Sequence, residues 1–395
     1  MKLHNNTIRG VHTALAAIFE EGQYADKVIE RTLKSNPKWG ARDRSFIAET
    51  TYEMVRWWRL INYLSPSKEP YDLFGTYWLM QGHTLPPWEE FAKINPDKLK
   101  EKYEKLDDPA KLESVPDWLF DLGKKELGDK WEAEIHSLNQ EAQVVLRVNT
   151  LKTTRERLKN RLAEDNIHTH IIKGYPDALI LDERTNVFRN PAFKEGMFEV
   201  QDASSQLVAA ALAVEPGMRV IDACAGAGGK SLHIAALMQN KGKVLSMDVE
   251  EWKLQQTKLR ARRDGVSIIE RKVIEGSKTI KRMKETADRL LLDVPCSGLG
   301  VLRRNPDTKW KLSEESIEKV RQTQQEILQS YPSMVKPGGQ MVYATCSILP
   351  SENQDQIAKF LASEAGKDFT LIEDQKVLAQ ESGFDGFYIA RLQKK

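Results

Sequence analysis

The spacing of apolar residues along the 395-residue chain is helical up to about residue 64. Four apolar residues fall on one helix face, at positions i, i+4, i+7 and i+8: Val11, Leu15, Ile18 and Phe19. A second stripe of the same period runs through residues 41–64, which contain no proline or glycine. The pattern predicts an all-α domain over residues 1–64.

The next two segments have a different pattern. Residues 65–139 carry five prolines between positions 66 and 96 with aromatic residues between them, so we expect a linker with short helices. Within residues 140–200, VVLRVNT and HTHIIKG predict strands. The stretch TTRERLKNRLAEDN predicts the helix between them, with Thr153 or Thr154 as N-cap. We therefore expect a small α+β subdomain over residues 140–200.

From about residue 218 onward, short runs rich in Val, Ile and Leu alternate with helix-like segments. The runs are MRVIDACA, KVLSMDV, SIIERKV, RLLLDVP and QMVYATCS, and FTLIED and GFYIARL are candidates for closing strands. The helix expected over SEESIEKVRQTQQEILQSYPSMV should be kinked or shortened at Pro332. This alternation, with nearly continuous apolar strands, predicts an α/β domain over residues 201–395 with a mainly parallel sheet covered on both faces.

Composition limits the classes of protein to consider. Hydrophobic residues make up 41% and charged residues 29% of the chain, which is typical of a folded globular protein. No run approaches the ~18 apolar residues of a membrane helix, and MKLHNNTIRG lacks the apolar core of a secretory signal. Three cysteines are too few for a disulfide framework, so we expect a reducing, cytoplasmic setting and no membrane partner.

Charge is balanced overall but unevenly distributed. The formal net charge is only +2, yet residues 252–289 hold twelve Lys or Arg against five acids, and RRNPDTKWK at 303–311 is also basic. Two interpretations stay open. These runs are solvated helix surfaces, or they form a basic rim beside a pocket that binds nucleic acid.

Four segments fall where predicted strands end: DACAGAGG, MDVE, DVPC and TCS. Ligands of parallel α/β sheets bind at the carboxyl ends of the strands, so these segments are expected to line one cleft. The glycine-rich loop matches neither the phosphate-loop pattern nor G-x-G-x-x-G. Asp248 ends the next strand, 20 residues after Gly228, where a carboxylate can bind ribose hydroxyls. A nucleoside cofactor is indicated; S-adenosylmethionine meets these requirements, and NAD is the alternative.

Two cysteines follow predicted strands beside this cleft. Cys296 and Cys346, with the carboxylate of Asp293, suggest covalent catalysis by a thiolate. A methyl donor and a thiol are both needed to methylate pyrimidine C5, because adding a thiolate to C6 makes C5 nucleophilic. Cys224 is interpreted as a small residue of the core.

Several motifs together resemble the Sun family of RNA 5-methylcytosine methyltransferases: DACAGAGGKS, MDV, LLDVPCSGLG, RRNPDTKW and YATCSILPSENQDQI. The resemblance covers about residues 140–392 and is strongest to the branch that acts on 16S ribosomal RNA. The first 64 residues are similar to a NusB-like RNA-binding domain. The resemblance implies a Rossmann-like class I methyltransferase domain, S-adenosylmethionine as cofactor and RNA, most of all ribosomal RNA, as substrate. We expect a monomer.

The resemblance also implies roles for single residues. Cys346 matches the nucleophile, Cys296 the residue that helps product release, and Asp293 the acid that contacts the cytosine. The cofactor-binding set that it implies is Asp222, Cys224, Ala225, Gly226, Ala227, Gly228, Gly229, Lys230, Asp248, Glu275 and Asp293. The RNA-proximal set is Arg303, Arg304 and Lys309. No metal ligands are implied.

Two positions depart from the family pattern. Ala227 stands where the family loop usually has proline, which should loosen the loop, and Glu275 is one carbon longer than the usual acid at the third strand. Transfer RNA as substrate and a non-catalytic RNA-binding assembly factor stay open as alternatives. An amine methyltransferase is disfavoured, since DVPCSG occupies the place where D/N-P-P-Y would be needed.

Overall fold

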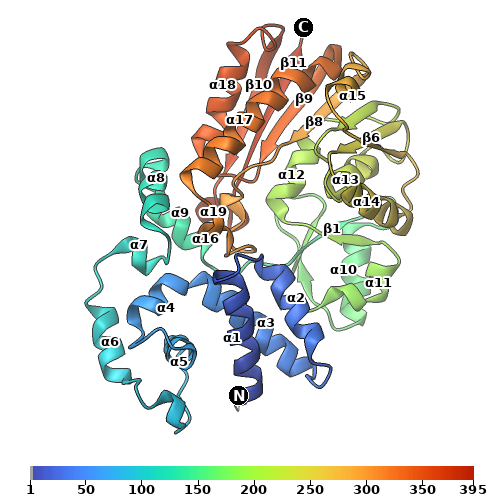
Figure 1. The fold of residues 1–395 in the computed structure, drawn as a ribbon. Helices are drawn as coiled ribbons and strands as arrows, with labels where there is room; N and C mark the ends of the chain where they lie inside the picture. Colours follow the sequence, from blue (N-terminus) through green and yellow to red (C-terminus); the bar gives the residue numbers. More distant parts are fainter. Residues whose placement is uncertain (1–2) are drawn as a thin grey trace. The chain divides into compact units, whose positions relative to one another are not determined.

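The computed structural model describes residues 3–395 (Figure 1). The chain divides into two compact units. Unit 1 holds the chain up to Gln140 together with Leu302–Ser313, and unit 2 holds Glu141–Val301 and Glu314–Lys395. A segment of the second half of the chain therefore belongs to the first unit, which the sequence did not predict.

The regular structure of unit 1 is helical, as predicted for its first 64 residues. Its helices are α1 (Asn5–Phe19), α2 (Ala25–Ser35), α3 (Ala41–Arg56), α4 (Trp58–Leu64), α5 (Pro70–Met80), η1 (Glu89–Phe91), α6 (Pro96–Glu104), α7 (Pro109–Leu112), α8 (Asp117–Leu127), α9 (Lys130–Leu138) and α16 (Thr308–Lys311). The stripe predicted over 41–64 breaks at Trp57, between α3 and α4. Beyond the break, the backbone N–H groups of Arg59 and Leu60 both bond to the Ser114 hydroxyl.

Part of the predicted linker lies in the core of unit 1. Phe74 and Trp78 of α5 are buried in one hydrophobic cluster with Ile8 and Ile47 of α1 and α3. The prolines did not prevent helices here because Pro70, like those that begin α6 and α7, occupies the first helical turn, where no backbone N–H is needed.

The first part of unit 2 is a four-stranded antiparallel sheet of order β2-β3-β1-β4. Its strands are β1 (Val145–Val148), β2 (Thr169–His170), β3 (Ala178–Leu181) and β4 (Phe198–Val200). Helix α10 (Arg155–Glu164) lies between β1 and β2 in the chain, and the Thr154 hydroxyl caps it by accepting from the N–H of Arg157. The first strand and this helix were predicted; β2 is shorter than expected, and β3 and β4 were missed.

The second sheet has seven strands in the order β10-β11-β9-β8-β5-β6-β7. The strands are β5 (Arg219–Asp222), β6 (Lys243–Asp248), β7 (Ile269–Val273), β8 (Ala287–Asp293), β9 (Val335–Thr345), β10 (Phe369–Val377) and β11 (Phe387–Lys394). Strands β7, β6, β5, β8 and β9 are parallel, and β11 and β10 close the sheet antiparallel. The predicted mainly parallel sheet is confirmed, with all seven expected strands.

Helices cover both faces of this sheet (Figure 1). Side chains alternate along each strand: Leu290 and Leu292 join the core under α17 (Glu314–Ser330) and α18 (Gln354–Leu361), and Leu291 joins the core under α12 (Ala203–Ala211) and α13 (Gly229–Leu237). The remaining helical segments are η2 (Val187–Arg189), α11 (Pro191–Lys194), α14 (Glu251–Asp264), α15 (Ser277–Lys281), η3 (Leu299–Val301), η4 (Tyr331–Met334), η5 (Pro350–Glu352) and α19 (Ala379–Ser382). Helix α17 ends at Ser330, before Pro332, as predicted.

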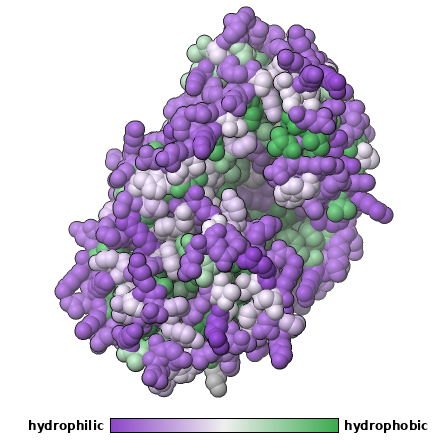
Figure 2. All heavy atoms as spheres, in the orientation of Figure 1, coloured by the Kyte–Doolittle hydropathy of each residue, from purple (hydrophilic) through white to green (hydrophobic). Residues whose placement is uncertain are grey.

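The face of the molecule drawn in Figure 2 is mostly hydrophilic, with small hydrophobic patches. Among residues 3–395, no helix is both long and apolar enough to cross a membrane.

Candidate functional site

Strand order places the site at a switch point of the large sheet. From β5, the chain proceeds to β6 and β7 on one side and then to β8 and β9 on the other. Loops that leave β5 and β8 therefore diverge and open a crevice at their carboxyl ends. The four segments predicted to line one cleft all follow strands at this edge.

The glycine-rich loop after β5 has a conformation that needs glycine. Gly226 and Gly228 have φ angles of 52° and 81°, in the left-handed region. A Cβ at Gly228 would lie 2.5 Å from the side chain of Thr257. The carboxylate of Asp248, at the end of β6, accepts from the N–H of Gly226 at 2.8 Å and from that of Glu250 at 2.9 Å. The second-strand acid thus shapes the loop besides facing the crevice.

A cavity of about 990 Å³ lies along this edge. Five of the predicted cofactor residues line it: Cys224, Gly226, Asp248, Glu275 and Asp293. The apolar side chains of Ile274, Ile280 and Ile327 complete the wall. Carboxylates at the rim of a largely apolar pocket suit a nucleoside with an aliphatic, charged tail, so these residues fit S-adenosylmethionine.

The other predicted cofactor residues lie outside this lining. They are Asp222, Ala225, Ala227, Gly228, Gly229 and Lys230. Asp222 is fully buried behind the loop, where its carboxylate accepts from the Ser231 hydroxyl at 2.6 Å. Burial raises the pKa of Asp222 to about 7. Its position therefore indicates a structural role, and its contact with the cofactor stays a prediction.

Lys230 and Asp293 form an ion pair at the site. The Nζ atom of Lys230 lies 2.7 Å from Oδ2 of Asp293, and both side chains are largely shielded from solvent. Burial by itself would lower the pKa of Lys230, but the carboxylate of Asp293 outweighs it and raises the pKa. The lysine is therefore a permanent cation that orients the acid.

The structure brings Cys296 and Cys346 together. Their Sγ atoms lie 3.2 Å apart, although 50 positions separate them in the chain, and all three cysteines are free. Cys346 follows β9 directly and Cys296 lies three residues after β8, so the pair sits where two adjacent parallel strands end. The hydrogen bond to Cys346 and burial raise the pKa of the Cys296 thiol well above its ordinary value. Cys296 thus keeps its proton in this state.

Cys224 is the third free cysteine of the chain. Burial raises the pKa of its thiol well above the ordinary value, so it has no thiolate character at neutral pH. Its side chain packs against the core of the large sheet, as interpreted from the sequence, while part of the residue lines the cavity.

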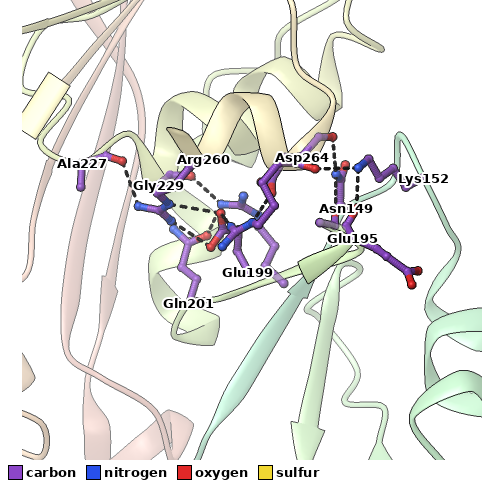
Figure 3. A network of polar contacts seen from close by, with 12 residues as sticks. Asn149, Lys152, Glu195, Glu199, Gln201, Ala227, Gly229, Arg260 and Asp264 are labelled. Carbon is purple, nitrogen blue, oxygen red and sulfur yellow. Dashed lines mark hydrogen bonds and ion pairs between the residues drawn. The ribbon is translucent and has the colours of Figure 1, made fainter. Parts of the chain in front are cut away.

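A polar network ties the glycine-rich loop to the four-stranded sheet (Figure 3). Arg260 of α14 donates to the carbonyl of Ala227 at 2.9 Å and to Glu199 of β4 at 3.1 Å. Arg147 of β1 donates to the carbonyl of Gly229 at 2.5 Å. Burial would raise the pKa of Glu199, but the guanidinium groups of Arg260, Arg263 and Arg147 together outweigh it and lower the pKa. A buried charge cluster therefore holds two loop carbonyls in place.

Sequence reasoning missed this network. Arg260 and Arg263 belong to the basic run 252–289, which was interpreted either as a solvated helix surface or as a basic rim for nucleic acid, yet both pair with the buried Glu199. Their guanidinium groups therefore form ion pairs within unit 2. A signal was present in FEVQ at 198–201, since an acid flanked by apolar residues in a strand calls for a buried partner.

Two of the three predicted RNA contacts are interior residues of unit 1. Lys309 has no exposed surface and donates to Asn139 at 3.1 Å, and Arg303 donates to the carbonyl of Ser137 at 2.8 Å. Burial and the neighbouring Arg56 lower the pKa of Lys309 well below its ordinary value. Phosphate contacts require exposed cations, and both side chains are buried here, so their predicted RNA contacts stay predictions. Arg304 is half-buried, and its predicted role stays a prediction.

The physical reason is that residues 302–313 are built into the helical core. Arg56 donates to the carbonyls of Leu302 and Arg303, and the indole of Trp310 donates to the carbonyl of Val55. These hydrogen bonds connect residues 302–313 to the helices of unit 1. Within the described chain, residues 3–395, no group of three or more His, Cys, Asp or Glu is arranged to hold a metal ion.

Two family models match parts of this chain. A family model described as 16S rRNA methyltransferase RsmB/F matches residues 209–393, and a model of the RsmF/B-like ferredoxin-like domain matches residues 115–188. The second match begins earlier than the subdomain predicted from residue 140.

Curated relatives match over most of the chain. A probable ribosomal RNA small subunit methyltransferase B of Synechocystis sp. is 33% identical, over 96% of this chain and 97% of the relative. The ribosomal RNA small subunit methyltransferase B of Proteus mirabilis is 36% identical over 290 residues, which are 71% of this chain and 66% of the relative.

Solved structures have the same fold. The crystal structure of PH0851 has a TM-score of 0.82 at 26% identity and covers 100% of both chains. A methyltransferase homolog protein from Pyrococcus horikoshii has a TM-score of 0.65 at 25% identity, over 73% of this chain and 98% of that chain.

Fold, crevice and comparisons define a Rossmann-like, S-adenosylmethionine-dependent RNA methyltransferase, as predicted. The chain belongs to the ribosomal RNA small subunit methyltransferase B family.

Proposed function

We propose that this protein methylates C5 of a cytosine in 16S ribosomal RNA through a covalent bond between Cys346 and C6 of the base. The observation that carries the proposal is the pair of thiols, 3.2 Å apart, at the ends of adjacent parallel strands beside the cavity. A single cysteine in this place could be an ordinary core residue. Two facing thiols with the carboxylate of Asp293 nearby are instead suited to covalent catalysis and product release.

The chemistry explains why a sulfur nucleophile is needed. The thiol of Cys346 gives up its proton to solvent, its Sγ atom bonds to C6 as a thiolate, and the electron pair of the C5=C6 bond moves toward C5. S-adenosylmethionine, when bound, supplies the methyl group that C5 accepts. A base then takes the proton from C5, the double bond re-forms, and the bond between Sγ and C6 breaks to free Cys346.

Cys296 is suited to accept that proton. The largest cause of its raised pKa is the hydrogen bond to Cys346. Once Cys346 is bonded to carbon, this hydrogen bond is lost and one cause of the raised pKa is removed, so Cys296 can release its own proton to solvent and, as a thiolate, take the proton from C5. The release step thus acquires a base only after the nucleophile has added.

Asp293 and Lys230 orient the base. The lysine holds the carboxylate at 2.7 Å, beside the cavity that would take the cofactor. From there the carboxylate of Asp293 accepts from the exocyclic amine of cytosine and favours addition at C6. A cytosine stacked in a helix hides C5 and C6, so the substrate base is unpaired or flipped out.

The relatives are named as ribosomal RNA methyltransferases, which favours ribosomal RNA as the substrate, and the helical domain over residues 1–64 would add RNA contacts. The exposed cations of residues 140–200 and 252–289 would bind the backbone. Transfer RNA is the alternative substrate. Bisulfite sequencing of total RNA from cells with and without the protein decides between them, because only the true substrate loses 5-methylcytosine.

A denaturing gel tests the covalent mechanism. Cys296→Ala protein, incubated with 16S ribosomal RNA and S-adenosylmethionine, should accumulate a protein–RNA adduct that survives denaturation. The matched control is the double variant Cys296→Ala/Cys346→Ala, which should form none. Full turnover by Cys296→Ala without an adduct would contradict the proposal, and so would an adduct in the double variant.

A further inference from the structure

A fully buried carboxylate lies behind the two thiols. Glu352 ends η5 and has no exposed surface. Its Oε1 atom accepts from the hydroxyls of Ser297 at 2.5 Å and Ser347 at 2.6 Å. Its Oε2 atom accepts from the N–H of Ser297 at 2.8 Å and from the side-chain amide of Gln324 at 3.0 Å. A carboxylate has about four acceptor positions, so this one is saturated.

The two serines directly follow the two cysteines. Ser297 comes after Cys296 and Ser347 after Cys346, and the serine hydroxyls lie 3.2 Å apart, the same separation as the thiols. Two Cys-Ser dipeptides from different loops thus lie side by side, with one carboxylate holding both serines.

Neither loop can shift alone without breaking this bridge. If one serine moved away, Glu352 would keep a buried charge with an empty acceptor position, which is costly in a site closed to water. The glutamate itself is fixed, because Tyr343 donates to its backbone carbonyl at 2.7 Å, and Gln324 also donates to the carbonyl of Pro295 at 2.9 Å.

We propose that Glu352 is a positioning residue that sets the separation of the two thiols by binding the serine after each cysteine. The proposal rests on the proposed function, in which Cys346 adds to the base and Cys296 serves release. Besides this geometric effect, the charge of Glu352 contributes to the raised pKa of Cys296, after the larger effects of Cys346 and burial. Glu352 therefore acts on both cysteines through contacts that never reach the substrate.

The test uses a probe that needs both thiols at once. Phenylarsine oxide condenses with two neighbouring thiols, forming two As–S bonds and releasing water, so its affinity reports their separation in protein without RNA. Glu352→Gln keeps the size of the side chain but turns one acceptor into a donor. We expect it to weaken phenylarsine oxide binding at least tenfold, and to lower kcat for methyl transfer on the order of 100-fold. The KM for RNA and the affinity for S-adenosylmethionine should stay close to the wild-type values.

Serine variants separate positioning from folding. Ser297→Ala and Ser347→Ala each remove one arm of the bridge and leave the carboxylate in place, so each should reduce arsenical affinity and kcat. Combining either with Glu352→Gln should add little, because the three residues act as one unit. Cys296→Ser is the control that abolishes high-affinity arsenical binding.

Clear outcomes would overturn the proposal. Wild-type arsenical affinity and kcat in Glu352→Gln would do so, and if that variant fails to fold, unchanged values in both serine variants would do so. The arsenical measurement needs no RNA or cofactor. If Cys296→Ala protein forms no covalent adduct with RNA, the proposed function fails, while the arsenical still decides whether Glu352 sets the thiol separation.

Discussion

Arg260 donates a hydrogen bond to the backbone carbonyl of Ala227, at 2.9 Å, from the helix that follows the next strand. Ala227 is the position where we expected a looser cofactor loop for lack of a proline. The structure provides another restraint, since Arg260 is itself held by the buried Glu199 (Figure 3). A proline ring would restrict the loop backbone directly. In this chain a hydrogen bond from a distant helix restricts it instead.

Replacing Arg260 by methionine should therefore weaken cofactor binding. The loop carbonyl loses its charged donor and Glu199 loses part of its compensation, at a cost of about 1.5–3 kcal/mol for a hydrogen bond to a charged group. We expect the Kd for S-adenosylmethionine, measured by calorimetry, to rise roughly tenfold or more. Lys258→Met is the matched control, since Lys258 is an exposed cation of the same helix. Equal affinities in both variants would contradict the role of Arg260.

Removing the sulfur of Cys346 should abolish methyl transfer and leave the binding of S-adenosylmethionine intact. Cys346→Ala cannot bond to C6, so C5 stays a poor nucleophile and methyl transfer should fall below detection. Cys346 does not line the cavity, so the Kd for S-adenosylmethionine should stay within about twofold of wild type. Single-turnover transfer of labelled methyl groups and calorimetry measure the two effects. Residual transfer near the wild-type rate would remove Cys346 from the mechanism.

Gly300 is expected to tolerate no side chain. Its N–H donates to the carbonyl of Cys346 at 2.9 Å, and a Cβ would lie 2.7 Å from that oxygen and 2.2 Å from the carbonyl oxygen of Gly386. Gly300→Ala must push these backbone segments apart, at a cost of about 1–3 kcal/mol. We expect a lower midpoint in urea unfolding and a loss of methyl transfer larger than the loss of cofactor affinity.

Gly40→Ala is the control for that variant, because the nearest atom to its added Cβ is 3.9 Å away. If Gly300→Ala and Gly40→Ala behave alike in unfolding and in methyl transfer, the close approach at Gly300 has no mechanistic consequence.

Stability should fall in mild acid because of a buried histidine. Burial lowers the pKa of His233 from 6.5 to about 4, although the carboxylate of Asp177 at 2.9 Å opposes this shift. Between these two values the unfolded chain binds a proton that the folded chain does not. The free energy of unfolding therefore decreases as pH falls through this window, by up to about 1.4 kcal/mol per pH unit.

The comparison of pH 7.5 with pH 5 in urea unfolding isolates this effect. His233→Gln should lose less stability than wild type over that interval, whereas His168→Gln, at an exposed position, should lose as much as wild type. His12 has its pKa lowered in the same direction, so part of the acid sensitivity should persist in His233→Gln. An unchanged pH dependence in His233→Gln would exclude its contribution.

The local pattern of the sequence determined the class of protein. Alternation of apolar runs with amphipathic helices predicted the seven strands of the large sheet, and the rule that ligands bind at strand ends placed the motifs with Asp248, Asp293, Cys296 and Cys346 at one edge. These inferences succeed because strand and helix periods, glycine turns and strand-end chemistry are properties of short segments.

Tertiary structure alone decided how distant residues pair. It set the two thiols 3.2 Å apart, gave Ser297 and Ser347 a shared carboxylate, and turned Arg260 from the expected RNA rim toward a loop carbonyl. It also buried Lys309, which local basic composition had suggested was exposed. The reason is that the sequence around a charged residue does not show whether its side chain is exposed or buried. Whether that side chain faces water or an interior partner depends on segments far away in the chain.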